Sequence, residues 1–366
     1  MRTQKELLYR IGLSFIPKLG NQTIKKLIDH FGSAQYIYEQ ANNQELVTAK
    51  IRKDWIKAIS SRSTIDRATQ EIEFINQYNI QALTYESPNY PQRLKNCYDA
   101  PFLLYYKGNT NLNASRIVSI VGTRKPTSRG IMFCEQLIDN LKTYDILIAS
   151  GLAYGIDITA HKRCISNGMD TVGVVAHGLD QIYPAKHRKT AQQMVNQGGI
   201  LSEFTSEMAP LQSNFPMRNR IIAGMSDAVV VIETAKKGGS MITAYMANEY
   251  NKDVFAVPGR TEDPYSKGCN HLIKTHRAAL LESAEDIAYI MGWQKKKDAG
   301  LQKKMFVQLS KTEQTIVNLL VGQDPVHMED LIQQTQISTS KIATILLELE
   351  LKSIVKALPG NYFRLI

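Results

Sequence analysis

The residues that decide the fold are 117–141, which read IVSIVGTRKPTSRGIMFCEQLIDNL. The β-branched run Ile117–Val121 predicts a buried strand, and the apolar spacing in Ser128–Leu141 predicts an amphipathic helix after a short loop. The alternation continues, with strands expected at 145–149, 171–176, 200–202, 228–232 and 254–257 and helices at 156–166, 187–196, 218–225 and 240–251. Strands that alternate with such helices form right-handed crossovers in a mainly parallel sheet. We therefore expect an α/β protein built on an extended Rossmann-like sheet.

Helical segments precede and follow this sheet. Residues 1–85 predict helices at 5–11, 22–30, 34–40, 52–60 and 63–78, and the turn Ile16-Pro-Lys-Leu-Gly20 suits either a helix-hairpin-helix that meets a phosphate or a small packing module. The lysine-rich residues 294–304 predict a solvated linker. Residues 305–366 read as three helices and a hairpin, the plan of a winged helix. The expected domains are 1–85, 86–293 and 305–366, with the linker 294–304 between the last two.

The composition is that of an ordinary globular protein. Of its 366 residues, 43% are hydrophobic and 21% are charged, and no apolar run approaches the ~20 residues needed to cross a bilayer. The first residues lack the pattern of a signal peptide. We expect a cytoplasmic protein with no membrane partner.

The cysteines and histidines form no recognisable metal or disulfide pattern. The four cysteines are scattered without a C-x-x-C pair, which favours buried thiols. His161, His177 and His187 fall on three different predicted elements, and we interpret them as helix-cap and surface residues. We expect no bound metal.

The charge balance favours a polyanionic partner. The formal net charge is +10 and the sequence pI is about 9.2, which points first to nucleic acid. The loop after the first strand carries Arg124, Lys125 and Arg129 without an acid, more charge than one small phosphate requires. Thr123 and Arg124 directly follow Gly122, so the G-x-G-x-x-G pattern of a dinucleotide site is missing. A polyphosphate backbone fits this loop better than a dinucleotide cofactor, and we expect no cofactor.

Three further loops leave the same predicted sheet edge. Ser150 and Gly151 begin one of them, in which Asp157 is expected to cap the amides of the following helix. Another loop places Tyr183 among cations. In single-strand binding sites, an aromatic ring typically stacks on a base while neighbouring cations contact the phosphates. The loop at Gly239 and Ser240 enters a helix and forms an anion cradle. Together the four loops would form a continuous basic rim.

The segment 214–225 adds an aromatic residue and two arginines to this rim. Phe215 lies at the edge of a helix, while Arg218 and Arg220 leave it on different faces. Either both arginines contact phosphate, or one of them pairs with Glu203 or Glu233 instead. The sequence leaves these two alternatives open.

Seven ordered motifs give the chain a specific resemblance. They are VGTR at 121–124, SGLAYGID at 150–157, GLDQIYP at 178–184, NFPMRNRIIAG at 214–224, GSMITA at 239–244, VFAVPG at 254–259 and GCNHLI at 268–273. In this order they resemble the bacterial DNA-processing protein A family, also called Smf. The helical module at 1–85, similar to a sterile-α-motif or helix-hairpin-helix domain, and the winged helix match a common arrangement of that family.

The resemblance implies a recombination mediator that is not an enzyme and has no catalytic residues. Such proteins bind incoming single-stranded DNA during natural transformation, displace single-strand-binding protein, load a RecA-type recombinase and form homodimers. It implies Arg124 as the main phosphate contact, with Lys186 or Lys189 facing it. The residues expected to contact DNA are Gly122, Thr123, Arg124, Lys125, Ser150, Gly151, Tyr183, Lys186, His187, Lys189, Phe215, Arg218, Asn219, Arg220, Gly239 and Ser240.

Two other functions remain open at this point. A Rossmann-fold hydrolase that acts on nucleoside monophosphates would use Glu233 or Asp157 to polarise water or ribose. A sequence-specific regulator would read duplex DNA through the winged helix. In the third helix of that domain, however, the charges of Lys341 and Lys352 are balanced by those of Glu348 and Glu350. That near-neutral helix is a poor match for a major groove, so we expect protein contact or weak duplex binding there.

Overall fold

The structure, a computed structural model, describes residues 4–40, 43–295, 309–321, 325–352, 354–358 and 360–365. The chain forms two compact units, Met1–Lys295 and Lys296–Ile366, which are described separately. The predicted linker 294–304 lies, from residue 296 onward, outside the described residues.

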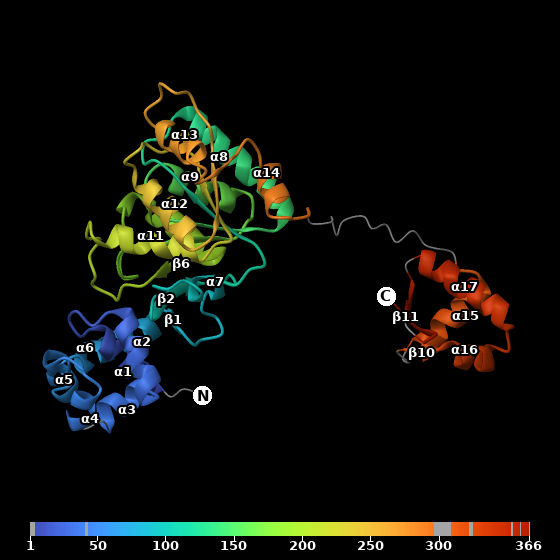
Figure 1. The fold of residues 1–366 in the computed structure, drawn as a ribbon, viewed down its shortest axis with the longest axis horizontal. Helices are drawn as coiled ribbons and strands as arrows, with labels where there is room; N and C mark the ends of the chain where they lie inside the picture. Colours follow the sequence, from blue (N-terminus) through green and yellow to red (C-terminus); the bar gives the residue numbers. More distant parts are fainter. Residues whose placement is uncertain are drawn as a thin grey trace. The chain divides into compact units, whose positions relative to one another are not determined.

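A nine-stranded sheet forms the centre of the described part of the first unit (Figure 1). Its spatial order is β1-β2-β6-β5-β4-β3-β7-β8-β9, and all pairs from β6 to β9 are parallel. The antiparallel strands β1 and β2 extend one edge. The strands are β1 Gln81–Thr84, β2 Leu103–Gly108, β3 Ile117–Val121, β4 Leu147–Ser150, β5 Thr171–Val174, β6 Gly198–Ser202, β7 Ala228–Val231, β8 Asp253–Ala256 and β9 Ala279–Leu280. The expected α/β fold with a sheet rich in parallel pairs is confirmed.

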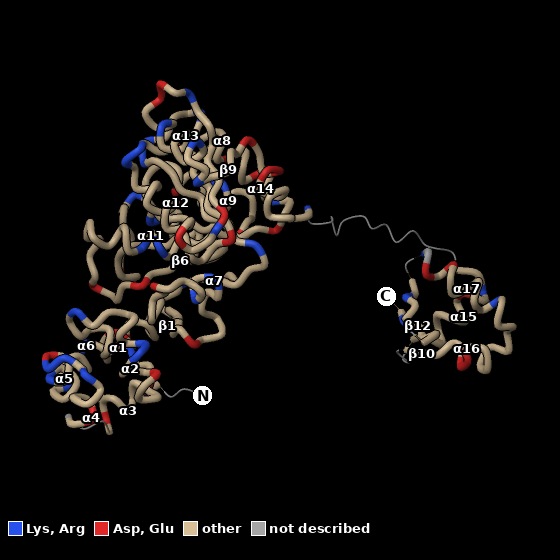
Figure 2. Tube along the Cα trace, in the orientation of Figure 1, with Lys and Arg blue, Asp and Glu red and all other residues tan. Residues whose placement is uncertain are grey.

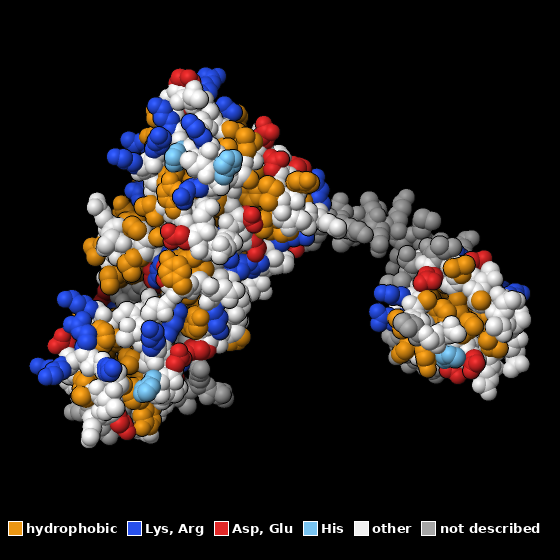
Figure 3. Space-filling view, viewed as in Figure 1, with side chains coloured by type: hydrophobic (Ala, Val, Ile, Leu, Met, Phe, Trp, Pro, Cys, Tyr) orange, Lys and Arg blue, Asp and Glu red, His pale blue; other side chains and the backbone are white. Residues whose placement is uncertain are grey.

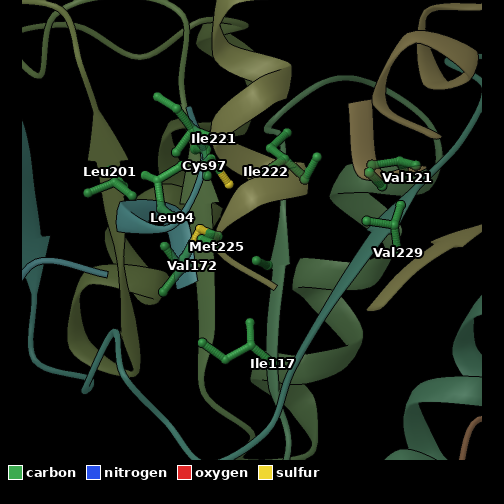
Figure 4. Close-up of a cluster of buried hydrophobic side chains, with 14 of the residues drawn as sticks. Leu94, Cys97, Ile117, Val121, Val172, Leu201, Ile221, Ile222, Met225 and Val229 are labelled. Carbon is green, nitrogen blue, oxygen red and sulfur yellow. The ribbon is translucent and has the colours of Figure 1, made fainter. Parts of the chain in front are cut away.

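Apolar residues of the central strands alternate between the two faces of the sheet. In β3, Ile117 and Val121 belong to a cluster with the helices α11 (Asn214–Gly224) and α12 (Gly239–Glu249), part of which is seen in Figure 4. Val118 and Ile120 point to the other face and pack against α8 (Ser128–Leu141), α9 (Ile156–Ser166) and α14 (Ala284–Ile290). Both faces of the sheet are therefore covered, as the period-two pattern of a buried parallel strand requires.

The remaining helices of the sheet region are short or lie near its edges. They are α7 Gln92–Lys95, α10 Arg188–Asn196 and α13 Lys267–Lys274. The strand predicted to begin at Asp145 begins two residues later, because Asp145 has a left-handed backbone (φ 56°) that closes the turn after α8. In the sheet region, the sequence did not indicate β1, β9, α7, α13 or α14.

The N-terminal helices share a core with the sheet edge. They are α1 Gln4–Ser14, α2 Asn21–Phe31, α3 Ala34–Glu39, α4 Asn43–Thr48, α5 Lys53–Ser60 and α6 Ile65–Gln77. Phe102, Leu103 and Tyr105, from β2 and the residue before it, belong to the same apolar cluster as these helices. At the start of α2, Asn21 accepts a hydrogen bond from the Phe102 amide at 3.1 Å, and Gln22 donates to the Tyr98 carbonyl. This contact favours the packing-module interpretation of the 16–20 turn over a phosphate-binding hairpin.

The described part of the second unit is a winged helix. It contains α15 Lys311–Leu320, β10 Val326–His327, α16 Met328–Thr335, α17 Thr339–Leu351, β11 Val355–Leu358 and β12 Tyr362–Leu365, and its sheet has the order β10-β12-β11. A capping box is present at Ser310 and Glu313, with the Glu313 amide 3.3 Å from Oγ of Ser310. Lys352 is paired with Glu313, which further reduces the free positive charge near α17.

Across the described residues, no helix is both long enough and apolar enough to span a membrane.

Candidate functional site

Loops from the carboxyl ends of β3, β4, β5 and β7 meet in a pocket of about 920 Å³. The β3 loop contributes residues 121–125, the β4 loop Ala153 and Asp157, and the β5 loop Tyr183. Further wall comes from Pro210 and Gln212 before α11, from α11 itself, from the glycine loop and first turn of α12, and from Tyr265. Side chains from four loops far apart in sequence therefore line one pocket at one edge of the sheet.

Backbone hydrogen bonds tie the β3 loop to the segments that follow β7 and β4. The Thr123 amide donates to the Glu233 carbonyl at 2.7 Å, and the Ile156 amide donates to the Thr123 carbonyl at 3.2 Å. Gly155 adopts φ +81°, and a Cβ there would lie 2.2 Å from the Thr123 oxygen. Only glycine fits this position, and its presence fixes the base of the Arg124 loop.

Phe215 brings the pocket's cations and aromatic rings together. The Arg124 guanidinium carbon lies 5.4 Å from the centroid of the Phe215 ring, and that of Arg218 lies 6.0 Å from it. Tyr183, 47% exposed, has its ring centroid 6.2 Å from that of Phe215 with the planes at 60°. Guanidinium groups near a ring gain cation–π stabilisation that orders them before a ligand arrives.

Arg218 and Asp157 form the floor of the pocket. Arg218 is 5% exposed and donates from one terminal nitrogen to the Val174 carbonyl. Burial lowers the pKa of Arg218 to about 10, so it remains a cation at neutral pH, and burial raises the pKa of Asp157 while Arg218 opposes that rise. Gly151 permits this packing, because a Cβ there would lie 2.3 Å from an Asp157 oxygen. Asp157 accepts from the Ala153 amide of the preceding loop at 3.3 Å, where we had expected it to cap α9.

The three histidines are buried, which corrects their interpretation as surface residues. His161 contacts the Thr171 hydroxyl at 2.7 Å and the Gly151 carbonyl at 2.6 Å, and burial lowers its pKa to about 4. His177 accepts from the Tyr183 amide at 3.1 Å, and burial also lowers its pKa. His187 lies 2.8 Å from the Leu152 carbonyl. They therefore fix the loops from inside, and the described residues contain no cluster suited to a metal ion.

Several predicted contact residues lie away from the pocket surface. Ser150 is buried and donates to the Ile120 carbonyl at 2.6 Å. Arg220 is buried, paired with Glu203 and bonded to the Asp99 carbonyl, so the predicted phosphate contact is replaced by an internal ion pair. Gly151 supports the pocket floor from beneath, and the buried His187 supports a loop. Lys186 and Lys189 are exposed but do not line the pocket.

Residues that the sequence did not predict as DNA contacts also line the pocket. Tyr265 reaches the pocket from the loop after β8, and its carbonyl accepts from the Thr234 amide at 2.6 Å. Lys237 lines the pocket beside Gly239. Tyr265 lies well beyond the predicted strand 254–257, so no signal in the sequence indicated it, and its place in the pocket depends on β8 pairing with β7.

The electrostatic character of the pocket is positive. Among the described residues that line it, Arg124, Lys125, Arg218 and Lys237 are cations and Asp157 is the acid. Figure 3 shows Lys and Arg side chains gathered around α13, and in Figure 2 Lys and Arg positions also lie along the trace near α11 and α12. The fold and the pocket thus define an extended Rossmann-like protein with a cationic, aromatic pocket suited to a phosphate-bearing ligand.

The chain belongs to the DNA recombination-mediator protein A family. The model of that family matches residues 81–292, and the model of the DprA winged helix domain matches residues 307–361. Protein Smf of Synechocystis is 30% identical over 397 residues, which cover 98% of this chain and 98% of the relative. DNA processing protein DprA of Bacillus subtilis is 38% identical over 246 residues, which cover 66% of this chain and 82% of the relative.

Two solved structures of the same family are similar to this fold. DprA of Streptococcus pneumoniae has a TM-score of 0.67 and 31% identity, over 81% of this chain and all of that chain. The protein from Helicobacter pylori has a TM-score of 0.54 and 29% identity, over 59% of this chain and 98% of that one. The latter structure is described as showing a single-stranded DNA binding mode.

Proposed function

We propose that this protein binds single-stranded DNA in the pocket around Arg124 and acts as a recombination mediator. It protects incoming DNA during natural transformation, displaces single-strand-binding protein and loads a RecA-type recombinase, as a cytoplasmic homodimer without catalytic activity. The description of the matched family and the DNA binding of its Helicobacter pylori member support this assignment.

The arrangement of Arg124, Phe215 and Arg218 carries the proposal. An exposed cation beside a half-buried ring can meet a phosphate while the ring contacts a base, and such sites are tolerant of sequence. Tyr183 adds a second, more exposed ring. A mononucleotide would need one phosphate contact, whereas this pocket offers four cations along its walls.

Neighbouring groups extend the binding surface. Gly238 precedes α12 without a side-chain cap, so the first amides of α12 near Gly239 can meet a phosphate, while the Ser240 hydroxyl is already bonded to Thr234 at 2.7 Å. Asn219 donates to the Gly239 carbonyl at 3.5 Å and links α11 to this loop. Beyond Pro184, the exposed Lys186 and Lys189 continue the positive surface.

The hydrolase alternative is not favoured. Glu233 is engaged at the start of α8, where its carboxylate accepts from the Thr127 amide at 2.9 Å and from the Thr127 hydroxyl at 2.5 Å. Asp157 is buried against Arg218. Glu233 does not line the Arg124 pocket, and Asp157 at its floor is held by Arg218 and the Ala153 amide, so both carboxylates are already engaged. Release of free base from nucleoside monophosphates by the purified protein would contradict this view.

The other parts of the chain take supporting roles in the proposal. We assign residues 1–85 to a helical domain, 86–293 to the DNA-binding domain, 294–304 to a linker and 305–366 to a winged-helix domain. The winged helix would contact a protein partner or bind duplex DNA weakly.

Fluorescence anisotropy with labelled oligonucleotides over a salt series tests the proposed DNA binding. We expect tighter binding to the single strand than to the duplex of the same length, and the logarithm of the affinity should fall linearly with log[salt]. Equal affinity for both forms, or no dependence on salt, would contradict the proposal. Mediator activity is measured by the rate at which a RecA-type recombinase assembles on a strand coated with single-strand-binding protein, and an unchanged rate would contradict that part.

A further inference from the structure

The segment 203–213, which joins β6 to α11, forms part of the wall of the Arg124 pocket. Pro210 and Gln212 line the pocket from this segment. Most of the segment is exposed or half-buried, but Ser206 is only 8% exposed. A surface segment with few buried residues is held mainly by the contacts of those residues. The position of this part of the wall therefore depends on what holds Ser206.

A buried carboxylate of the N-terminal helices holds Ser206. Glu71, on α6, is 1% exposed. Ser206 donates to the Glu71 carboxylate with its amide at 3.0 Å and with its hydroxyl at 2.5 Å. Arg67, one turn earlier on α6, donates to Glu71 at 3.0 Å, to the Ser206 carbonyl at 2.7 Å and to the Ser206 hydroxyl oxygen at 2.8 Å. Because hydrogen bonds to charged groups are stronger than those between neutral groups, α6 fixes Ser206 firmly.

On its other side, the segment contacts the loop after β5. The Met208 carbonyl accepts from the Gly178 amide at 3.0 Å and from Nε2 of Gln181 at 3.2 Å. The same loop carries Tyr183, which lines the pocket. A displacement of Ser206 would therefore move two parts of the pocket, the wall from the segment itself and the loop that carries Tyr183.

We propose that Glu71 is a positioning residue for DNA binding, and that through Ser206 it sets the 203–213 segment and the Tyr183 loop where they receive the strand. This role rests on the proposed binding of single-stranded DNA and gives the N-terminal helices a part in it. It also accounts for a carboxylate buried at this place on α6, where apolar contacts alone would join the helices to the sheet at a lower cost of desolvation.

A pair of substitutions with the same charge change tests the role of Glu71. Glu71→Gln keeps the size of the side chain, and Glu73→Gln is the matched control because Glu73 is exposed on the same helix. Loss of an acid favours binding to a polyanion, so Glu73→Gln should bind at least as tightly as wild type. Glu71→Gln should instead bind a labelled single strand about fivefold more weakly in fluorescence anisotropy, because the charged acceptor for Ser206 and Arg67 is lost.

Ser206→Ala tests the other end of the contact without any change of net charge. It removes the hydroxyl bonds to Glu71 and Arg67 and keeps the amide bond. We expect a smaller loss of affinity in the same direction, about twofold or more. If urea unfolding shows that Glu71→Gln does not fold, Ser206→Ala decides the question, and wild-type affinity of that variant overturns the inference.

Two double-mutant cycles separate positioning of the pocket from a general loosening of the fold. Combined with Tyr183→Leu, Glu71→Gln should cause a loss about threefold or more below the product of the two single losses, because both changes act on one loop. Lys237 lines the pocket from the loop before α12, and within the described residues no hydrogen bond joins it to the 203–213 segment. The losses from Lys237→Ala and Glu71→Gln should therefore multiply to within about twofold.

The outcomes distinguish this inference from the proposed function. If Glu71→Gln binds the strand as tightly as Glu73→Gln does, the inference is overturned while the proposed function stands. Equal coupling in the two cycles overturns it as well, because Glu71 would then act through the fold as a whole. If the wild-type protein binds no single strand, the proposed function fails and the inference fails with it.

Discussion

Replacing Glu203 by glutamine should remove the contribution of Glu203 to the pH dependence of the free energy of unfolding. The Glu203 carboxylate is 6% exposed and paired with Arg220, and among the described residues one of its oxygens has no hydrogen-bond partner. Burial raises the pKa of Glu203 to about 7, and the nearby Asp99 adds to the rise while Arg220 opposes it. The ion pair therefore does not recover the whole cost of burying this carboxylate.

The sign and size of the effect follow from proton linkage. Between pH 4.5 and about 7 the unfolded chain has an ionised Glu203 while the folded chain has a protonated one, so raising the pH weakens the folded state. At about 1.4 kcal/mol per pH unit, the loss amounts to roughly 3 kcal/mol across this range. The Glu203→Gln variant lacks this loss, so its free energy of unfolding should rise by roughly 3 kcal/mol relative to wild type from pH 5 to pH 8.

Urea unfolding followed by tryptophan fluorescence measures this difference in the right part of the chain. The two tryptophans, Trp55 and Trp293, both belong to the first unit, so the signal reports that unit alone. Glu207→Gln serves as the control, since the Glu207 side chain is 78% exposed. A difference between Glu203→Gln and wild type that stays flat from pH 5 to pH 8 would refute the burial argument for Glu203.

Four other substitutions test individual contacts, one of them as a control. Gly155→Ala should lower the free energy of unfolding by about 2 kcal/mol or more in the same urea assay, because it adds a clash with Thr123 to the strain of positive φ. Gly168→Ala, with φ +70° and open space around its Cβ, should cost about 1 kcal/mol, and equal losses would contradict the clash. Because His161 is buried neutral, it should contribute a loss of roughly 3 kcal/mol as the pH drops from 6.5 to 4, opposite in sign to the contribution of Glu203. The His161→Gln variant should therefore gain about this much stability relative to wild type over that range, and a difference that stays flat would disprove this origin. Ser310→Ala should lower the stability of the second unit by about 1 kcal/mol in calorimetry, and an unchanged transition would rule out the capping contribution.

The central elements of the fold could be predicted because their sequences carry strong periodicity. The segment from Ile117 to Leu141 alternates as a buried strand and then follows a helical spacing, and both elements form where expected. The strands β1 and β9 have four and two residues, too few to show a pattern, and they form because neighbouring strands supply their hydrogen bonds. Short edge elements of this kind depend on tertiary context.

The candidate site could be predicted as a set of loops but not as individual contacts. Arg218 and Arg220 are two residues apart on α11, and the sequence correctly placed them on different faces. Which face meets the pocket is decided by the packing of α11 on the sheet, which buries Arg220 against Glu203. The burial of His177 has the same origin, because a loop residue is covered only when the loops around it fold together.

The most direct test of DNA binding at this pocket compares two arginine variants over a salt series. Arg124→Ala removes an exposed cation from the pocket, whereas Arg52→Ala removes one that is 52% exposed beside α5 and does not line the pocket. The account predicts that Arg124→Ala weakens binding to single-stranded DNA and reduces the slope of log affinity against log[salt] by about 0.7, with Arg52→Ala unchanged. An Arg124→Ala variant with wild-type affinity and slope would contradict the account.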